Sequence, residues 1–97
     1  MGNIELMTAK EAFNETAYRN EANNILKNIA ISIQAAYSTG YYFTQVNVDS
    51  RTSKGAIDLV LKELADKGYK AEFCLDNIGK PSEHYWDIIK INWKEAN

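Results

Sequence analysis

One helical pattern covers almost a third of this 97-residue chain and limits the shapes that it can adopt. Apolar side chains recur every three or four residues from Thr8 to Tyr37, which is the spacing of one face of an α-helix. Thr8 and Glu11 have the spacing of a capping box, and Gly40 suits the stop at the other end. Such a helix spans about 45 Å, whereas a domain of this size is only about 30 Å across. We therefore expect the helix to break or to project in its asparagine-rich first half.

The rest of the chain predicts three strands and a second helix. Aromatic and β-branched residues predict strands at Tyr41 to Val48, Tyr69 to Leu75 and Tyr85 to Trp93. Ser53 to Lys67 has the apolar stripe of an amphipathic helix, and Gly68 sits where a left-handed cap belongs.

The third predicted strand is apolar on both faces, which is typical of a central strand. Ile89, Ile91 and Trp93 face one side, and Trp86 and Ile88 face the other. The two other strands are joined by a helix and should run parallel to each other. We therefore predict an α+β fold with the element order α-β-α-β-β. Its three-stranded mixed sheet should have the order 1-3-2, with both helices on one face.

Composition narrows the classes of protein to which this chain can belong. Its length leaves room for one hydrophobic core, so we expect a single domain over residues 1–97 with a flexible tail at 1–7. The 11 basic and 13 acidic residues give a net charge of −2, which argues against a strongly basic nucleic-acid binder. The chain lacks an apolar run long enough for a membrane span and the layout of a signal peptide, so we expect a cytoplasmic protein with no membrane partner.

A single cysteine and a single histidine restrict the chemistry that the chain can perform. Cys74 alone excludes a disulfide scaffold and a four-cysteine zinc site. Glu83, His84 and Asp87 could ligate a metal only with a fourth partner such as Asp76, and a solvated loop is the simpler interpretation. His84 also has no nucleophile spaced to use it as a base. We therefore expect no catalytic residue, no metal site and no cofactor.

The turn before the second helix is the best candidate for a ligand site. Five residues follow the first strand and open the helix: Ser50, Arg51, Thr52, Ser53 and Lys54. A helix amino terminus offers N–H groups and a partial positive charge, and these side chains add hydroxyls and two cations. The pattern predicts a site for a phosphate or a carboxylate. The competing interpretation is a plain helix cap, because serine and threonine are common N-cap residues.

The sheet face away from the helices is a second candidate. Tyr41, Phe43, Trp86 and Ile88 are expected on this face, where they would form an unusually large apolar patch in water. We expect a homo-oligomer interface or a flat ligand platform. The alternative is that the amino-terminal tail or the first half of the long helix folds over this face.

Two segments of the chain resemble known sequences. They are the start Met7-Thr-Ala-Lys-Glu-Ala12 and the stretch Leu64-Ala-Asp-Lys-Gly-Tyr-Lys-Ala71 before a tryptophan-containing strand. They resemble small uncharacterised accessory proteins of tailed bacteriophages. The resemblance assigns no catalytic residue and implies a setting in the host cytoplasm. Phage accessory proteins often modulate host defences or host enzymes by binding, and some counter-defence proteins are oligomeric sponges for signalling nucleotides.

These observations predict a non-enzymatic, homo-oligomeric binding protein, a phage counter-defence or host-modulating factor. Its partner would be a small anionic, nucleotide-like ligand or a host protein. The alternative is a winged-helix-like DNA-binding regulator, with Arg51, Lys54 and Lys62 on phosphates. Asp58 and Glu63 on the same helix and the negative net charge favour the first interpretation.

Overall fold

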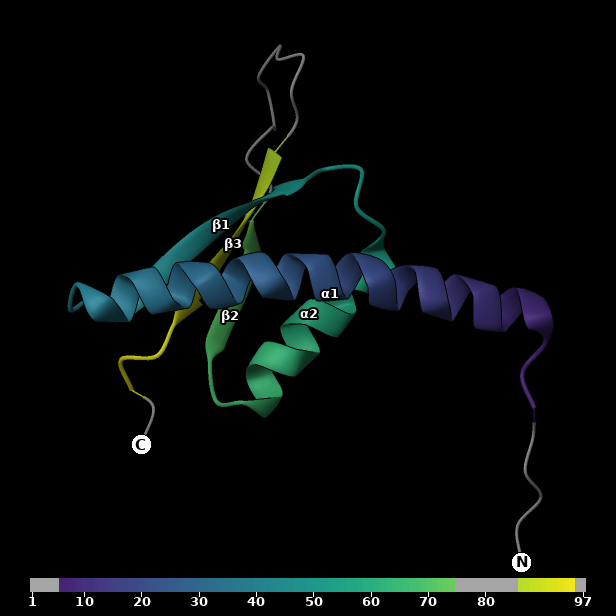
Figure 1. Ribbon diagram of the computed structural model, residues 1–97, viewed down its shortest axis with the longest axis horizontal. Helices are drawn as coiled ribbons and strands as arrows, with labels where there is room; N and C mark the ends of the chain where they lie inside the picture. The colour runs from purple at the N-terminus through teal and green to yellow at the C-terminus, as the bar shows by residue number, and fades with distance from the viewer. Residues whose placement is uncertain (1–5, 75–85, 96–97) are drawn as a thin grey trace, which may run out of the picture.

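The computed structural model describes residues 6–74 and 86–95 (Figure 1). The elements along the chain are α1 (Ala9–Ser38), β1 (Phe43–Asp49), α2 (Lys54–Asp66), β2 (Lys70–Cys74) and β3 (Trp86–Asn92). This is the predicted α+β fold with the predicted element order. The polar loop predicted at Asp76 to His84 and the residue Leu75 lie outside the described residues.

α1 is one uninterrupted helix whose first half projects from the domain. The Oγ1 of Thr8 accepts a hydrogen bond from the backbone N–H of Glu11 at 3.1 Å, as expected of a cap. Gly40 has a φ of +87°, which ends the helix as predicted. The first buried side chain of α1 is Ala22, and Phe13 is 74% exposed. Figure 1 shows the amino half of α1 extending past α2. The excess length of the helix is therefore accommodated by projection and not by a break.

α2 packs one apolar face against the rest of the domain. Ala56, Ile57, Val60 and Leu64 are buried, at the spacing that the sequence predicts. The backbone N–H of the residue after Gly68 donates to the carbonyl of Leu64 at 3.0 Å. This bond closes the last turn, and it requires the φ of +90° that Gly68 adopts.

The sheet has the strand order β1-β3-β2, as predicted. β3 pairs with both other strands, and Ile89 lies between Val46 of β1 and Phe73 of β2. Both hydrogen-bonded pairs are antiparallel, so β1 and β2 run parallel to each other without touching. The sheet is therefore antiparallel and not mixed, because the only parallel relation is between strands that β3 separates.

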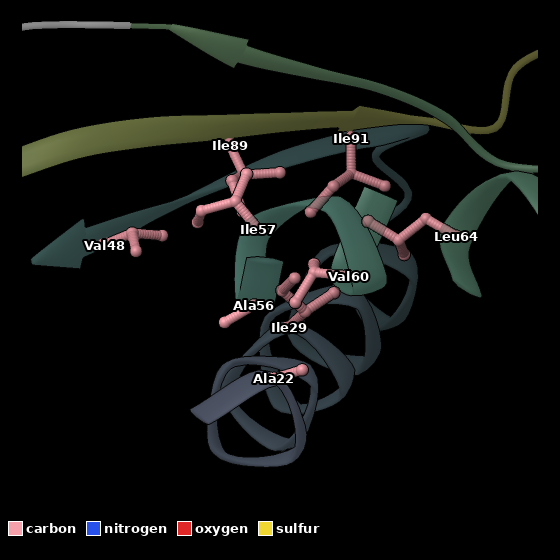
Figure 2. Packing of buried hydrophobic residues seen from close by; sticks show 9 residues of the cluster. All are labelled: Ala22, Ile29, Val48, Ala56, Ile57, Val60, Leu64, Ile89 and Ile91. Carbon is pink, nitrogen blue, oxygen red and sulfur yellow. The ribbon is translucent and has the colours of Figure 1, made fainter. Parts of the chain in front are cut away.

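The hydrophobic core fills the layer between the sheet and the helices (Figure 2). α1 contacts β1, α2 contacts β2, and the two helices contact each other, so both lie on one face of the sheet. The buried side chains of this core are Ala22, Ile29, Val48, Ala56, Ile57, Val60, Leu64, Ile89 and Ile91. No element within residues 6–74 and 86–95 covers the opposite face, which we call the outer face.

The two helices pack closely against each other where the projecting part of α1 ends. The ring of Tyr18 lies over Gly55, so close that a Cβ atom on Gly55 would be 2.7 Å from its Cδ2. Beside it, Arg19 and Glu63 form an ion pair at 3.6 Å. Close packing at this point therefore depends on the missing side chain of Gly55.

We predict that the backbone amides of Ile88 to Ile91 exchange with solvent more slowly than those of any other strand. Each β3 amide faces a neighbouring strand, whereas alternate amides of an edge strand have no strand partner. Amide hydrogen exchange followed by NMR measures this difference. Equal protection in Lys70–Cys74 of β2 would contradict the central placement of β3.

Candidate functional site

A cavity of about 310 Å³ lies beside the amino end of α2, at the carboxyl ends of β1 and β2. This edge is where ligands commonly bind in sheets with crossover helices, and the volume is at the low end of small-molecule sites. Its lining is mixed: the carboxylates Asp49, Asp58 and Asp87, the hydroxyls Ser50 and Thr52, the ammonium of Lys54, and the apolar Ile57, Leu61 and Phe73. We call this space the α2 cavity.

The α2 cavity collects only some of the residues predicted to bind an anion. Ser50, Thr52 and Lys54 line it. Arg51 is exposed and does not line the cavity, and Ser53 is hydrogen-bonded to Glu21 of α1. The predicted site therefore separates into cavity-lining residues and two residues with partners of their own.

Ser53 holds the carboxylate of Glu21, which comes from α1. Its backbone N–H donates to Oε2 and its hydroxyl donates to Oε1, both at 3.0 Å. A carboxylate at a helix amino terminus is stabilised by the N–H groups and the partial positive charge there. The chain thus supplies its own anion at this end of α2. Ser53 therefore occupies the N-cap position of α2, but its hydroxyl makes no capping hydrogen bond to the helix and binds instead to Glu21, 32 positions away.

Arg51 is paired with Asp49 across the turn. Its Nη2 lies 2.8 Å from Oδ2, its Nε donates to Oδ1 at 3.1 Å, and its backbone N–H donates to Oδ1 at 2.8 Å. The side-chain bonds from Arg51, followed by the backbone bond, lower the pKa of Asp49 from 3.8 to about 2. The same pair raises the pKa of Arg51. Arg51, one of the two cations predicted to bind an anion, is therefore already paired with a carboxylate within the turn.

We predict that Arg51→Ala returns the pKa of Asp49 towards 3.8. In the native protein the pair contributes stability above pH 3.8, and that contribution is lost as the pH falls towards 2, because the folded-state pKa lies below the unfolded one. The pair is exposed to solvent, so we expect only a small change in the free energy of unfolding at neutral pH. An NMR titration of the Asp49 carboxyl carbon measures the shift. A midpoint that stays near 2 in the variant would show that Arg51 is not its cause.

Asp87 is a functional candidate that is buried in the structure, whereas the sequence pattern favours a solvated loop. It lies on the inner face of β3, two residues before Ile89, and is only 4% exposed. The solvated-loop interpretation is therefore wrong for Asp87, while Asp76, Glu83 and His84 lie outside the described residues. The alternation with Ile89 and Ile91 was the signal that could have indicated its burial.

The Oδ1 atom of Asp87 has no hydrogen-bond partner among the residues that the structure describes. Buried polar atoms nearly always have a partner, so one without a partner needs an explanation. The same part of the chain contains no group of three or more His, Cys, Asp or Glu side chains placed to hold a metal ion. Asp87 thus lines the α2 cavity as a single buried acceptor.

The outer face is less apolar than expected. Phe43 is 60% exposed and makes an edge-to-face contact with Tyr41, with 5.8 Å between the ring centroids. Ile88 is half-buried near the other end of the face, and the side chain of Trp86 lies outside the described residues. A polar row separates the two ends: Gln45, Lys90 and Glu72 lie side by side on the three strands. Among the described residues, Tyr41 and Phe43 therefore do not form one continuous patch with Ile88.

The outer face is also hollowed. A depression of about 500 Å³ lies across the three strands. The side chains that border it on this face are Phe43, Gln45, Lys70, Glu72, Lys90 and Asn92. α1 lies on the opposite face of the sheet, so the first half of the long helix does not fold over this depression. We call this depression the outer-face hollow.

No family model matches this chain, and no curated protein or solved structure matches it significantly. Among the described residues, none of the helices combines the length and the apolar character that a membrane span requires. The function must therefore be argued from the α2 cavity and the outer-face hollow themselves.

Proposed function

We propose that this is a non-enzymatic binding protein that acts as a homo-oligomer, with the outer face of the sheet between copies. The observation that carries the proposal is the one-sided architecture: both helices cover one face, and no described element covers the other. Phe43 stands 60% exposed at the border of the outer-face hollow. An aromatic side chain entering a hollow on a second molecule is a common anchor of a protein interface.

The charges around the outer-face hollow favour a second copy of the same chain as the partner. A twofold interface brings the same patch together from both sides, so the patch must complement itself. Lys90 and Glu72 are neighbours across β3 and β2, and they offer both signs of charge at one place. In an antiparallel arrangement of two copies, Lys90 of each would face Glu72 of the other. The polar row that interrupts the apolar residues thus fits a non-obligate interface, whose composition resembles ordinary surface.

The assembled protein would present several copies of the α2 cavity, together with the projecting half of α1, to a small ligand or a host protein. The resemblance to phage accessory proteins makes the host cytoplasm the proposed setting. DNA binding has less support, because the exposed side of α2 mixes charges: Lys62 pairs with Asp66 at 3.7 Å, and Asp58 lies one turn before Lys62. A surface that follows phosphates would carry a basic stripe.

We predict that the native protein has a mass of at least twice 11.0 kDa at micromolar concentration. Phe43→Ser should lower this mass, because the variant removes the exposed aromatic anchor from the outer face. Its control is Phe13→Ser, which removes an even more exposed phenylalanine from the projecting half of α1 and should leave the mass unchanged. Size exclusion coupled to light scattering measures all three proteins. A native mass of 11.0 kDa, or dissociation by the control variant alone, would refute this interface.

A further inference from the structure

We propose that the α2 cavity binds a small organic amine, whose ammonium group pairs with Asp87 while its hydrocarbon part packs against Ile57, Leu61 and Phe73. This inference rests on the binding role proposed above, but it does not depend on self-association. It assigns a chemical class of ligand to the cavity, and it replaces the anionic ligand expected from the sequence with a cationic one.

Asp87 provides the first argument. This residue lines the α2 cavity, it is only 4% exposed, and its Oδ1 has no partner within the described residues. A buried carboxylate oxygen without a donor is unfavourable, because water is lost and no hydrogen bond replaces it. A ligand with N–H donors and a positive charge would remove this penalty. A ligand that binds in the cavity is therefore expected to donate a hydrogen bond to Oδ1 of Asp87.

The balance of charge provides the second argument. Three carboxylates line the cavity, those of Asp49, Asp58 and Asp87, against one ammonium, that of Lys54. Arg51 offsets only Asp49, to which it is bonded. An anionic ligand would meet two further carboxylates, whereas a cation is attracted by both. The sign of the field thus favours a cation.

The distribution of these groups favours an organic cation over a metal ion. The described residues contain no cluster of three metal-ligating side chains, which a divalent cation would need. The carboxylates are instead spread over β1, α2 and β3. One ammonium on Asp87, with the ligand extending from there, matches this arrangement.

The apolar residues of the lining indicate the chemistry and size of the ligand beyond its ammonium group. Ile57 and Leu61 lie on one side of α2, and Phe73 faces them from β2. A volume of about 310 Å³ accommodates a small molecule and not a long chain. The expected ligand is therefore an amine with a compact hydrocarbon body, such as an arylalkylamine.

Lys54 is the internal competitor for Asp87. It lines the same cavity and is exposed, and it makes no ion pair with the described carboxylates. If its ammonium reaches Asp87 in solution, the cavity closes on itself and an added amine must displace it. We expect Lys54→Gln to bind an amine more tightly than the native protein, because the competitor is gone.

Three probes with one hydrocarbon body separate charge from shape: 2-phenylethylamine, 2-phenylethanol and phenylacetate. Each is titrated into the native protein at neutral pH, and binding is followed by NMR shifts of the Thr52, Ile57 and Leu61 amides. We expect 2-phenylethylamine to bind at least about tenfold more tightly than the alcohol, because a charge-assisted hydrogen bond has about that effect. Phenylacetate should bind more weakly than either.

Asp87→Asn tests the residue, and Asp66→Asn is its matched control. The first variant should lose the preference for the amine over the alcohol, while the second should keep it, because Asp66 is exposed on α2 and does not line the cavity. Asp87→Asn should fold, since it replaces a buried carboxylate with a neutral side chain of the same shape. Thermal unfolding with and without the amine gives a second readout. The native protein should be stabilised by the amine, and Asp87→Asn should not.

Equal affinity of the native protein for the amine and the alcohol would overturn the proposal without any variant. Tighter binding of phenylacetate, or of a nucleotide in its place, would overturn the amine and restore the anion site. An unchanged preference in Asp87→Asn would also overturn the proposal, because the ammonium would then not pair with Asp87. Each of these outcomes leaves the mass of the assembly untouched, so failure here is distinguishable from failure of the oligomer.

Discussion

Ile89→Ala is expected to lower the free energy of unfolding by about 2–5 kcal/mol. Ile89 has no exposed surface, and it lies at the middle of the central strand between Val46 and Phe73. The smaller side chain would leave a cavity below both helices. A domain of this size has only about 5–15 kcal/mol of stability in total, so the loss would be a large part of it.

Urea unfolding followed by circular dichroism measures this loss, and Ile31→Ala is the matched control. Ile31 is 61% exposed on α1, so the same substitution there should change stability by less than about 0.5 kcal/mol. Similar losses in the two variants would contradict the position of the core. A small loss at Ile89 would contradict its complete burial between the sheet and the helices.

Gly55→Ala is expected to destabilise the native protein by about 1–3 kcal/mol, although alanine is the better helix former. The added methyl group would be 2.7 Å from the Tyr18 ring, so the ring or α1 must shift. In a Tyr18→Ala background the space is open, and the same change should stabilise by about 0.4–1 kcal/mol. We therefore predict that the effect of Gly55→Ala changes sign with the residue at position 18.

A double-mutant cycle on Gly55 and Tyr18 measures this reversal. Chemical unfolding of the four proteins gives the interaction energy directly. Stabilisation by Gly55→Ala in the native background would contradict the close contact between α1 and α2. It would also remove the support for Glu21 as the carboxylate that caps α2, since the same approach brings Glu21 to Ser53.

The parts of this fold that the sequence predicts are those that follow from local spacing. Gly40 and Gly68 end their helices because a positive φ is a property of single residues. Ile88 and Ile89 lie on opposite faces of β3, and a strand that is apolar on both faces is typical of the centre of a sheet. The length of α1 predicts that its first half breaks or projects, because helix length is proportional to residue number, and the structure shows projection.

The parts that the sequence does not predict depend on contacts between distant residues. Glu21 reaches Ser53 only because α1 crosses α2 at Tyr18, and no local pattern near Ser53 indicates it. Alternation along single strands does not give the pairing register, and the register is what places Lys90 between Phe43 and Ile88 on the outer face. Both candidate sites differ from the prediction for this reason. Glu21 occupies part of the predicted anion position, and Lys90 separates Phe43 from Ile88 in the predicted patch.

The α2 cavity and the outer face lie on different surfaces and allow separate functions. The cavity is lined by α2 and by the carboxyl ends of β1 and β2, whereas the hollow crosses the opposite side of the sheet. β3 contributes to both, with Asp87 towards the cavity and Lys90 towards the hollow. Assembly would therefore leave the ligand site open, which is the arrangement expected of an oligomeric binding protein.

The reaction rate of the Cys74 thiol tests the proposed interface most directly. Cys74 is the single cysteine of the chain, and it lies half-buried on the outer face beside Ile88. If copies meet through this face, the rate of reaction with a thiol reagent should fall as protein concentration rises and the mass increases beyond 11.0 kDa. Phe43→Ser should react at the fast rate at every concentration. A rate that stays constant while the native mass doubles would contradict the outer face as the surface between copies.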